Sequence, residues 1–401
     1  MENSLTITTI FIVYISAILI EQKRSGRGMT LLSLLLFYGI FYSLAPIFNT
    51  EIQYVDYSRV LLLTAAIMLC SLSYWISCWS SSNQDFSVLI EDSKVLRLSI
   101  FSLLTTSIVI GCYIVIFKIG VANFFFVSRA ERALMQSDIS RFMFFRDLIN
   151  ACCVFSICMS LNNKWPRFWK NMFIFTLVLS VSYSILTISR SNLVQIIFPI
   201  LYILSVKNKF SKSVVNITLI IGFLVATLWK SVLATLVIYQ DYDFSRVTLE
   251  FPPEFSSWYF ISENVFNPFL FYGKTIADAI LSLMYPFYDA TPLSIWYVQN
   301  FEPDLAEKGG GRGFSLLVES YINFGYIGIF IIFSLLGLLL GLIEKRSKSS
   351  FIFVYVCAVT FPILHKIYRS ELLSIMKVYW WYYLLPIVMI MIVLRFKTRI
   401  N

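Results

Sequence analysis

Long apolar runs recur along the whole chain and are separated by short charged connections. Runs of about 18 or more apolar residues can cross the hydrocarbon core of a bilayer as α-helices. Isolated strands are excluded there, because lipid leaves their backbone groups without hydrogen-bond partners. The runs also lack the alternation of polar and apolar residues that the strands of a membrane barrel need. The sequence therefore predicts an all-α, polytopic integral membrane protein.

Composition agrees with this class, since 58% of the residues are hydrophobic and only 14% are charged. A soluble domain has about a quarter charged residues. We find no internal repeat, no low-complexity tract and no soluble domain, so residues 1–401 are expected to form one membrane domain. We predict eleven spans, at residues 4–20, 29–48, 60–79, 99–118, 142–161, 171–187, 193–206, 214–239, 321–343, 351–365 and 372–394.

The connections between these spans differ in charge, and this difference predicts the orientation. If the spans alternate, six connections on one side hold 17 of the 32 Lys and Arg residues and five of the 23 acidic residues. Cytoplasmic loops are enriched in Lys and Arg, so this side is predicted to be cytoplasmic. The N-terminus is then outside and the C-terminus inside. This asymmetry explains the net charge of +9, and no nucleic acid is expected as a partner.

A long external loop, from about 240 to 320, is predicted between the eighth and ninth spans. Its stretch 269–288 is apolar enough for a twelfth span, but Lys274 and Asp278 would then lie in the membrane. We therefore expect one or two short interfacial helices there. Loops of this length are usually functional. The aromatic and acidic residues of this loop suit sugar binding and equally suit a belt at the membrane interface.

Charges at the outer ends of the spans are the main functional candidates, because a charge in lipid costs roughly 2.5–3.5 kcal/mol on insertion scales. Arg190, Arg312 and Arg369 lie where the orientation rule disfavours positive charge, and Arg129 lies in the second external loop. Arginine binds phosphate oxygens in a bidentate way, so these residues are predicted to bind a phosphate-bearing ligand. For Arg129, the polar face of an interfacial helix is an equal alternative.

Two further charges, Arg146 and Asp147, lie one turn inside the fifth span. Each could pair elsewhere in the bundle as a structural contact, or serve function, and the sequence leaves both alternatives open. No metal site is predicted. The letters DYD at 241–243 have no supporting ligands, and the seven cysteines lie in or beside spans at spacings that suit no metal. No cofactor is expected.

Glu319 and His365 are the candidate bases. A helix that begins near Ser315 would place Glu319 and Asn323 on one face with it, just below the glycine-rich loop that carries Arg312. A carboxylate there can accept a proton from a sugar hydroxyl, and partial burial would strengthen it as a base. The alternative is an Arg312–Glu319 ion pair that fixes the loop. His365 is the only histidine, and a neighbouring arginine would keep its imidazole neutral, as a base requires; a lone histidine is more often buried and hydrogen-bonded.

Three features together resemble one family. They are the stretch GRGFSLLVESYINFGYIGI (311–329), an external Ser189–Arg190 pair beside a span, and the basic HKIYR (365–369) near the C-terminus. The combination resembles the O-antigen polymerases, which are the Wzy-type oligosaccharide repeat-unit polymerases of Gram-negative bacteria. Length, span number and the late external loop also fit. In some of these polymerases an arginine is followed by ten residues and a glycine, whereas here Arg312 is followed by Gly325, two positions further.

The resemblance implies a C-type glycosyltransferase fold in the bacterial inner membrane, with a periplasmic N-terminus and a cytoplasmic C-terminus. It implies that the growing chain hangs from undecaprenyl pyrophosphate at the periplasmic face, where a hydroxyl of the next lipid-linked unit attacks its anomeric carbon. The pyrophosphate is already a good leaving group, so no metal is obligatory. Arginines would neutralise the charge of the pyrophosphate. The main candidates for this role are Arg190, Arg312 and Arg369, and Arg129 is a further candidate.

The base for the acceptor hydroxyl would be Glu319, or His365 as second choice. The lipid bilayer surrounds the protein, and a polysaccharide chain-length regulator is an expected protein partner. Three alternatives stay open, one of which is an unrelated peptidoglycan-type polymerase of the same membrane class. A flippase for lipid-linked oligosaccharides also needs basic residues for pyrophosphate, and an O-antigen ligase uses the same donor.

Overall fold

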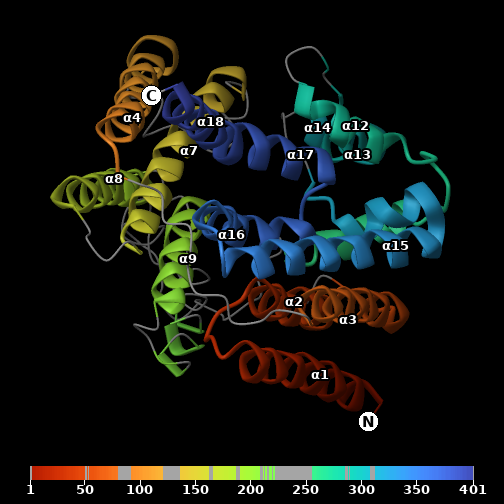
Figure 1. Ribbon diagram of the computed structural model, residues 1–401. Helices are drawn as coiled ribbons and strands as arrows, with labels where there is room; N and C mark the ends of the chain where they lie inside the picture. The colour runs from red at the N-terminus through yellow and green to blue at the C-terminus, as the bar shows by residue number, and fades with distance from the viewer. Residues whose placement is uncertain are drawn as a thin grey trace, which may run out of the picture.

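The computed structural model describes residues 2–49, 52, 54–79, 92–120, 136–161, 166–186, 190–207, 211, 213–214, 216–218, 220–221, 255–284, 288, 290–307 and 312–400. These residues form helices and connections without a β-strand (Figure 1). Within them, eight helical stretches are long and apolar enough to cross a membrane. An all-helical polytopic membrane protein is thereby confirmed, while the count of eleven spans and the C-type glycosyltransferase fold stay predictions.

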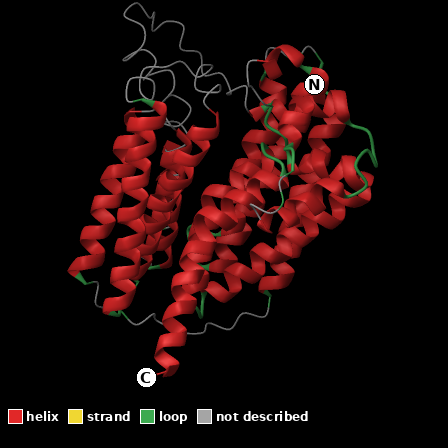
Figure 2. Ribbon diagram, turned by 90° about the horizontal axis from the view of Figure 1, so that it is seen from above, coloured by secondary structure: helices red, strands yellow, loops and turns green. Residues whose placement is uncertain are grey.

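The first half of the chain forms a series of long helices: α1 (Glu2–Ser25), α2 (Leu31–Phe48), α3 (Tyr57–Cys78), α4 (Lys94–Tyr113) continued by the π-helical η1 (Ile114–Ile119), α7 (Gln136–Met159), α8 (Arg167–Leu186) and α9 (Arg190–Val206). Every span predicted in this half coincides with one of them, except 214–239, most of which lies outside the described residues. Figure 2 shows the long helices lying side by side, with the connections gathered at their ends.

The second half begins with short helices and ends with long ones. The short helices are α11 (Ser257–Val265), α12 (Lys274–Leu281), the 3-10 turn η4 (Ser282–Met284), α13 (Leu293–Phe301) and α14 (Pro303–Glu307). The long ones and their connections are α15 (Leu316–Ser347), α16 (Phe351–Leu364), η5 (His365–Tyr368), α17 (Leu372–Lys377), the π-helical η6 (Val378–Leu384) and α18 (Leu385–Ile400).

The predicted external loop contains the short helices. The apolar stretch 269–288, which could have been a twelfth span, forms α12 and η4 and is therefore too short to cross a bilayer. α12 packs against α15 and α17, and α11 packs against α15. The described part of the loop is thus folded onto α15 and α17.

α15 packs closely along α3, and two glycines allow it (Figure 1). A Cβ atom at Gly337 would lie 2.1 Å from the carbonyl oxygen of Cys70. At Gly341, one helical turn further, it would lie 2.7 Å from the carbonyl oxygen of Tyr74. Membrane helices approach one another where small residues repeat at this spacing. The pair Gly337 and Gly341 therefore sets the distance between α3 and α15.

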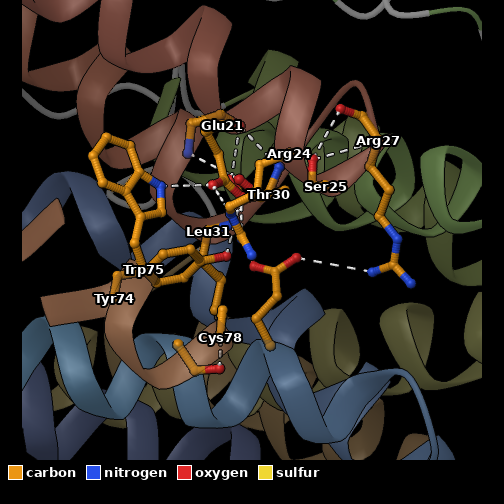
Figure 3. A network of polar contacts seen from close by, with 12 residues as sticks. Glu21, Arg24, Ser25, Arg27, Thr30, Leu31, Tyr74, Trp75 and Cys78 are labelled. Carbon is orange, nitrogen blue, oxygen red and sulfur yellow. Dashed lines mark hydrogen bonds and ion pairs between the residues drawn. The ribbon is translucent and has the colours of Figure 1, made fainter. Parts of the chain in front are cut away.

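A polar network joins α1, α2, α3 and α15 at the end predicted to be cytoplasmic (Figure 3). Glu21 on α1 is buried and accepts a hydrogen bond of 2.9 Å from the indole N–H of Trp75. Glu344 on α15 accepts one of 2.7 Å from the backbone N–H of Leu31, and lies 3.9 Å from the Arg27 guanidinium. A carboxylate at the first N–H groups of a helix is favourable. The network therefore fixes α2 against α15.

Candidate active site

Glu319 lies in the first turn of α15 and is fully buried. The helix begins where Ser315 caps it, with the Ser315 hydroxyl accepting from the backbone N–H of Val318 at 3.3 Å. One carboxylate oxygen of Glu319 accepts a hydrogen bond of 2.9 Å from the Thr275 hydroxyl. The other accepts one of 2.6 Å from the backbone N–H of Leu372. A single carboxylate therefore connects α12, α15 and α17.

Asn323 extends this contact by one helical turn. Its amide nitrogen donates to the Thr275 hydroxyl and to the backbone carbonyl of Glu319, each at 2.7 Å. Its carbonyl oxygen accepts from the backbone N–H of Gly273 at 2.9 Å. Glu319 and Asn323 thus share one face of α15, as their spacing predicted. Thr275 gave no signal in the sequence, because only the folded chain brings it beside two residues more than 40 positions away.

Arg312 does not pair with Glu319, so that alternative is wrong. Its Nε donates to both carboxylate oxygens of Glu302, at 3.0 and 2.8 Å, and this pair is partly exposed to solvent. The reason is that Glu319 points into the bundle, where Thr275 and Leu372 occupy its oxygens. The role of Arg312 in phosphate binding stays a prediction.

The loop beside Arg312 lies against the segment that carries Arg369. A Cβ atom at Gly313 would lie 2.7 Å from the carbonyl oxygen of Arg369. Only a residue without a side chain allows this approach. Two of the predicted arginines therefore come from segments in direct backbone contact, although 57 positions separate them in the sequence.

The segment HKIYRSE connects α16 to α17 and concentrates charge. His365 opens η5, is half-buried, and its ring lies 5.8 Å from the ring of Tyr38. The His365 Nδ1 atom is buried and forms no hydrogen bond of regular geometry within the described residues, while the ring lies near the backbone of Pro362. Lys366 and Arg369 are partly exposed, and neither forms an ion pair with another described residue. Burial raises the pKa of Glu371, which ends the segment.

Arg146 and Asp147 on α7 pair with each other, and neither forms an ion pair with another of the described side chains. Arg146 Nε and Nη2 lie 2.8 and 2.5 Å from one oxygen of Asp147, and both residues are buried. Lys366 lies within electrostatic reach of this pair and of Arg369. The geometry therefore gathers the basic residues of α7, η5 and the following turn at one end of the bundle.

The two remaining predicted arginines are described in part or not at all. Arg190 is the first residue of α9, and its side chain lies outside the described structure. Arg129 lies outside the described residues, as does the DYD stretch at 241–243.

Polar residues beside Arg190 form a network that the sequence analysis missed. The Asn150 amide on α7 donates to the side-chain oxygens of Asn192 at 2.8 Å and Gln195 at 3.0 Å, and accepts from the Ser180 hydroxyl at 2.8 Å. The sequence signal that could have predicted this network is the presence of uncharged amides, such as Asn192 and Gln195, at helical spacing within an apolar span. The network holds α7, α8 and α9 together.

The fold and these residues define a polytopic helical membrane protein with a charged site at one end of its bundle. Residues 284–400 match the family model of the O-antigen polysaccharide polymerase Wzy, which confirms the resemblance and supports a Wzy-type O-antigen polymerase. The match covers less than half of the chain and contains Arg312, Glu319, His365 and Arg369. Neither the curated proteins nor the solved structures that were searched gave a match.

Proposed function

We propose that the protein polymerises oligosaccharide repeat units linked to undecaprenyl pyrophosphate, at the periplasmic face of the bacterial inner membrane. The family match supports O-antigen polymerisation in general. The observation that carries the finer proposal is the pair Lys366 and Arg369, two cations without an ion-pair partner in the described structure. Gly313 brings the segment of Arg312 against the backbone of Arg369. Cations left uncompensated at the outer end of a bundle favour an anionic substrate.

The proposed reaction moves the growing chain onto the incoming unit. An acceptor hydroxyl attacks the anomeric carbon of the lipid-linked chain, and the bond from that carbon to the pyrophosphate oxygen breaks. Its electron pair stays on the pyrophosphate, where Arg369 and Lys366 stabilise the developing charge. Arg190, Arg312 and Arg129 are proposed to assist them. The hydroxyl proton passes to a base.

His365 and Glu319 differ as candidates for this base. His365 has a ring nitrogen that forms no hydrogen bond of regular geometry among the described residues, whereas both oxygens of Glu319 already accept hydrogen bonds. We therefore assign the proton to His365 and give Glu319 a positioning role, in which it holds α12 and the start of α17 beside the cations. The conservative variant Glu319→Asp should restore part of the activity that Glu319→Ala loses, with an unchanged pH profile.

Deletion of the gene tests the proposed function. Lipopolysaccharide from the deletion strain should show the lipid A core carrying a single repeat unit, because ligation continues without polymerisation. Bare core would instead indicate the loss of a ligase or a flippase. A full ladder of long chains in the deletion strain would refute the proposal outright.

A further inference from the structure

A cavity of about 140 Å³ lies among α4, α7 and α8, apart from the residues assigned above to the reaction. The rings of Phe142 and Tyr183, with centroids 5.6 Å apart, form one side of it. Gly111 and Cys112 line it from α4. Arg146 also borders the cavity, and its guanidinium lies 5.5 Å from the Tyr183 ring centroid on a side chain that is only 5% exposed. The walls of the cavity are thus almost wholly apolar, with one buried cation packed against the Tyr183 ring that forms part of them.

The cavity is open on one side, and that side faces lipid. Of the seven cysteines Cys112 is the exposed one, and its neighbours Val109 on α4 and Phe117 on η1 are 61% and 71% exposed. Such large apolar exposure on a membrane helix marks contact with the bilayer. Arg146 lies four residues into the span that begins at Phe142. In the predicted topology the cavity therefore lies in the outer half of the membrane.

The inner wall of the cavity adjoins the proposed active site. Arg146 forms the ion pair with Asp147, and Lys366 lies within electrostatic reach of both residues. Lys366 is in turn within reach of Arg369. A ligand that enters from the lipid side would therefore meet an apolar cavity first and the cationic segment next. This order matches an amphipathic molecule with a long apolar chain and an anionic head.

The size of the cavity fits a short piece of such a chain. A cavity of about 150 Å³ with apolar walls binds one benzene molecule, so this cavity holds roughly the five carbons of one isoprene unit. The rest of a longer chain would leave through the open side into the bilayer. Gly111 borders the cavity from α4, and a Cβ atom there would make only an ordinary contact of 3.7 Å with the Phe142 ring, whereas a longer side chain would extend into the cavity.

We propose that this cavity binds the isoprene unit of the carrier lipid nearest to its pyrophosphate, with the pyrophosphate directed toward Lys366 and Arg369. The proposal rests on the proposed function for the identity of the lipid. It adds the position where the chain enters, between α4 and α8, and it assigns Arg146 to the wall of that entrance.

The test is photo-crosslinking of the purified protein in lipid nanodiscs. The probe is a polyprenyl pyrophosphate that carries a diazirine in its first isoprene unit. Wild-type protein should be labelled on α4, α7 or α8, and undecaprenyl pyrophosphate should compete for the site. Gly111→Leu should reduce labelling by about tenfold or more, because its side chain removes the space for several methylene groups. Val109→Phe, on the lipid-facing side of the same helix, is the matched control and should label as the wild type does.

Gly111→Ala separates occupancy from folding, since a single methyl group makes only ordinary contacts there. It should label within about twofold of the wild type, and thermal unfolding of all variants checks their integrity. Undiminished labelling of a folded Gly111→Leu protein would overturn the proposal. So would competition by phospholipid but not by undecaprenyl pyrophosphate, because the cavity would then hold only bilayer lipid.

These outcomes are independent of the deletion experiment. The labelling needs no polymerisation, so a protein that binds the probe at α4 while its deletion leaves bare core would retain the cavity proposal and lose the proposed reaction. Conversely, a deletion strain with single-repeat core would support the proposed reaction, and undiminished labelling of Gly111→Leu would at the same time refute the cavity proposal.

Discussion

At the scale of single residues, the site depends on how each charge is compensated. Glu319 is buried and satisfied by the Thr275 hydroxyl and a backbone N–H, whereas Arg369 has no ion-pair partner in the described structure. A buried acceptor that loses its donor costs about 1–3 kcal/mol. Glu319 therefore contributes to holding the segments together, and Arg369 is left available for a ligand.

Thr275→Val tests the positioning role of Glu319. It removes the hydroxyl that donates to Glu319 and accepts from Asn323. We expect polymerisation to fall by about tenfold, because the loss of one hydrogen bond to a charged group is worth about 1.5–3 kcal/mol. Thr275→Ser keeps the hydroxyl and should keep most of the activity. Lipopolysaccharide ladders at matched expression measure both variants. Wild-type ladders from Thr275→Val would contradict the positioning role.

Arg369→Ala tests the difference between the two arginines of the site. We expect it to abolish long chains, because its charge has no carboxylate partner and is assigned to the pyrophosphate. Arg312→Ala should shorten the chains less, since Glu302 already compensates Arg312 at a partly exposed position. The measurement is the chain length of lipopolysaccharide on a gel when each variant is expressed in the deletion strain. An equal, complete loss in both would show that Arg312 leaves Glu302 to bind substrate, and equal wild-type ladders would remove both from the reaction.

At the scale of elements, α15 is kinked at Phe324 and Gly325, and its burial differs on the two sides of the kink. Residues 316–323 are buried, whereas Tyr326, Ile327 and Phe330 beyond the kink are exposed apolar side chains. The backbone is not helical at this point, and Gly325 adopts φ 62° and ψ −154°. The 23 residues from Gly325 to Ser347 then span roughly 34 Å at 1.5 Å per residue, close to the thickness of a bilayer core. The kink therefore separates the buried first turns of α15 from the part whose length matches a bilayer core.

Gly325→Ala tests the importance of the kink. The observed φ and ψ lie in a region that only glycine adopts without strain, so we expect a loss of about 1–3 kcal/mol in the free energy of unfolding. Gly111→Ala, at a glycine without positive φ, is the control and should unfold at nearly the wild-type temperature. Thermal unfolding in detergent measures both. Identical unfolding temperatures for Gly325→Ala and wild type would mean that the kink carries no constraint.

The elements also show how far sequence analysis reached. The apolar runs predicted the helices well, because hydropathy is a local property that a bilayer enforces residue by residue. The shared face of Glu319 and Asn323 followed from helical spacing alone. The Arg312–Glu302 and Arg146–Asp147 pairs were not predicted, because pairing depends on tertiary contacts and several carboxylates lay within range. The kink was missed as well, since one glycine in a helical run does not reveal its φ.

At the scale of the whole molecule, charge is divided between the two ends of the bundle. At the predicted cytoplasmic end, Glu21 and Glu344 are tied into a network that joins the first helices to α15. At the opposite end, Lys366 and Arg369 have no ion-pair partner among the described residues. The predicted cytoplasmic side has the larger excess of basic residues, as the orientation rule expects, whereas unpaired cations at the other end are disfavoured by that rule and favour an anionic ligand. The central claim is therefore that this outer end binds a diphosphate.

The most direct test is to measure the affinity of the purified protein for undecaprenyl pyrophosphate. The double variant Lys366→Gln/Arg369→Gln should bind at least about 100-fold more weakly than the wild type, because two charge-assisted contacts of about 1.5–3 kcal/mol each are lost. Arg97→Gln removes a cation at the opposite end, where Asp92 pairs with it, and should bind as the wild type does. An unchanged affinity in a folded double variant would contradict the account.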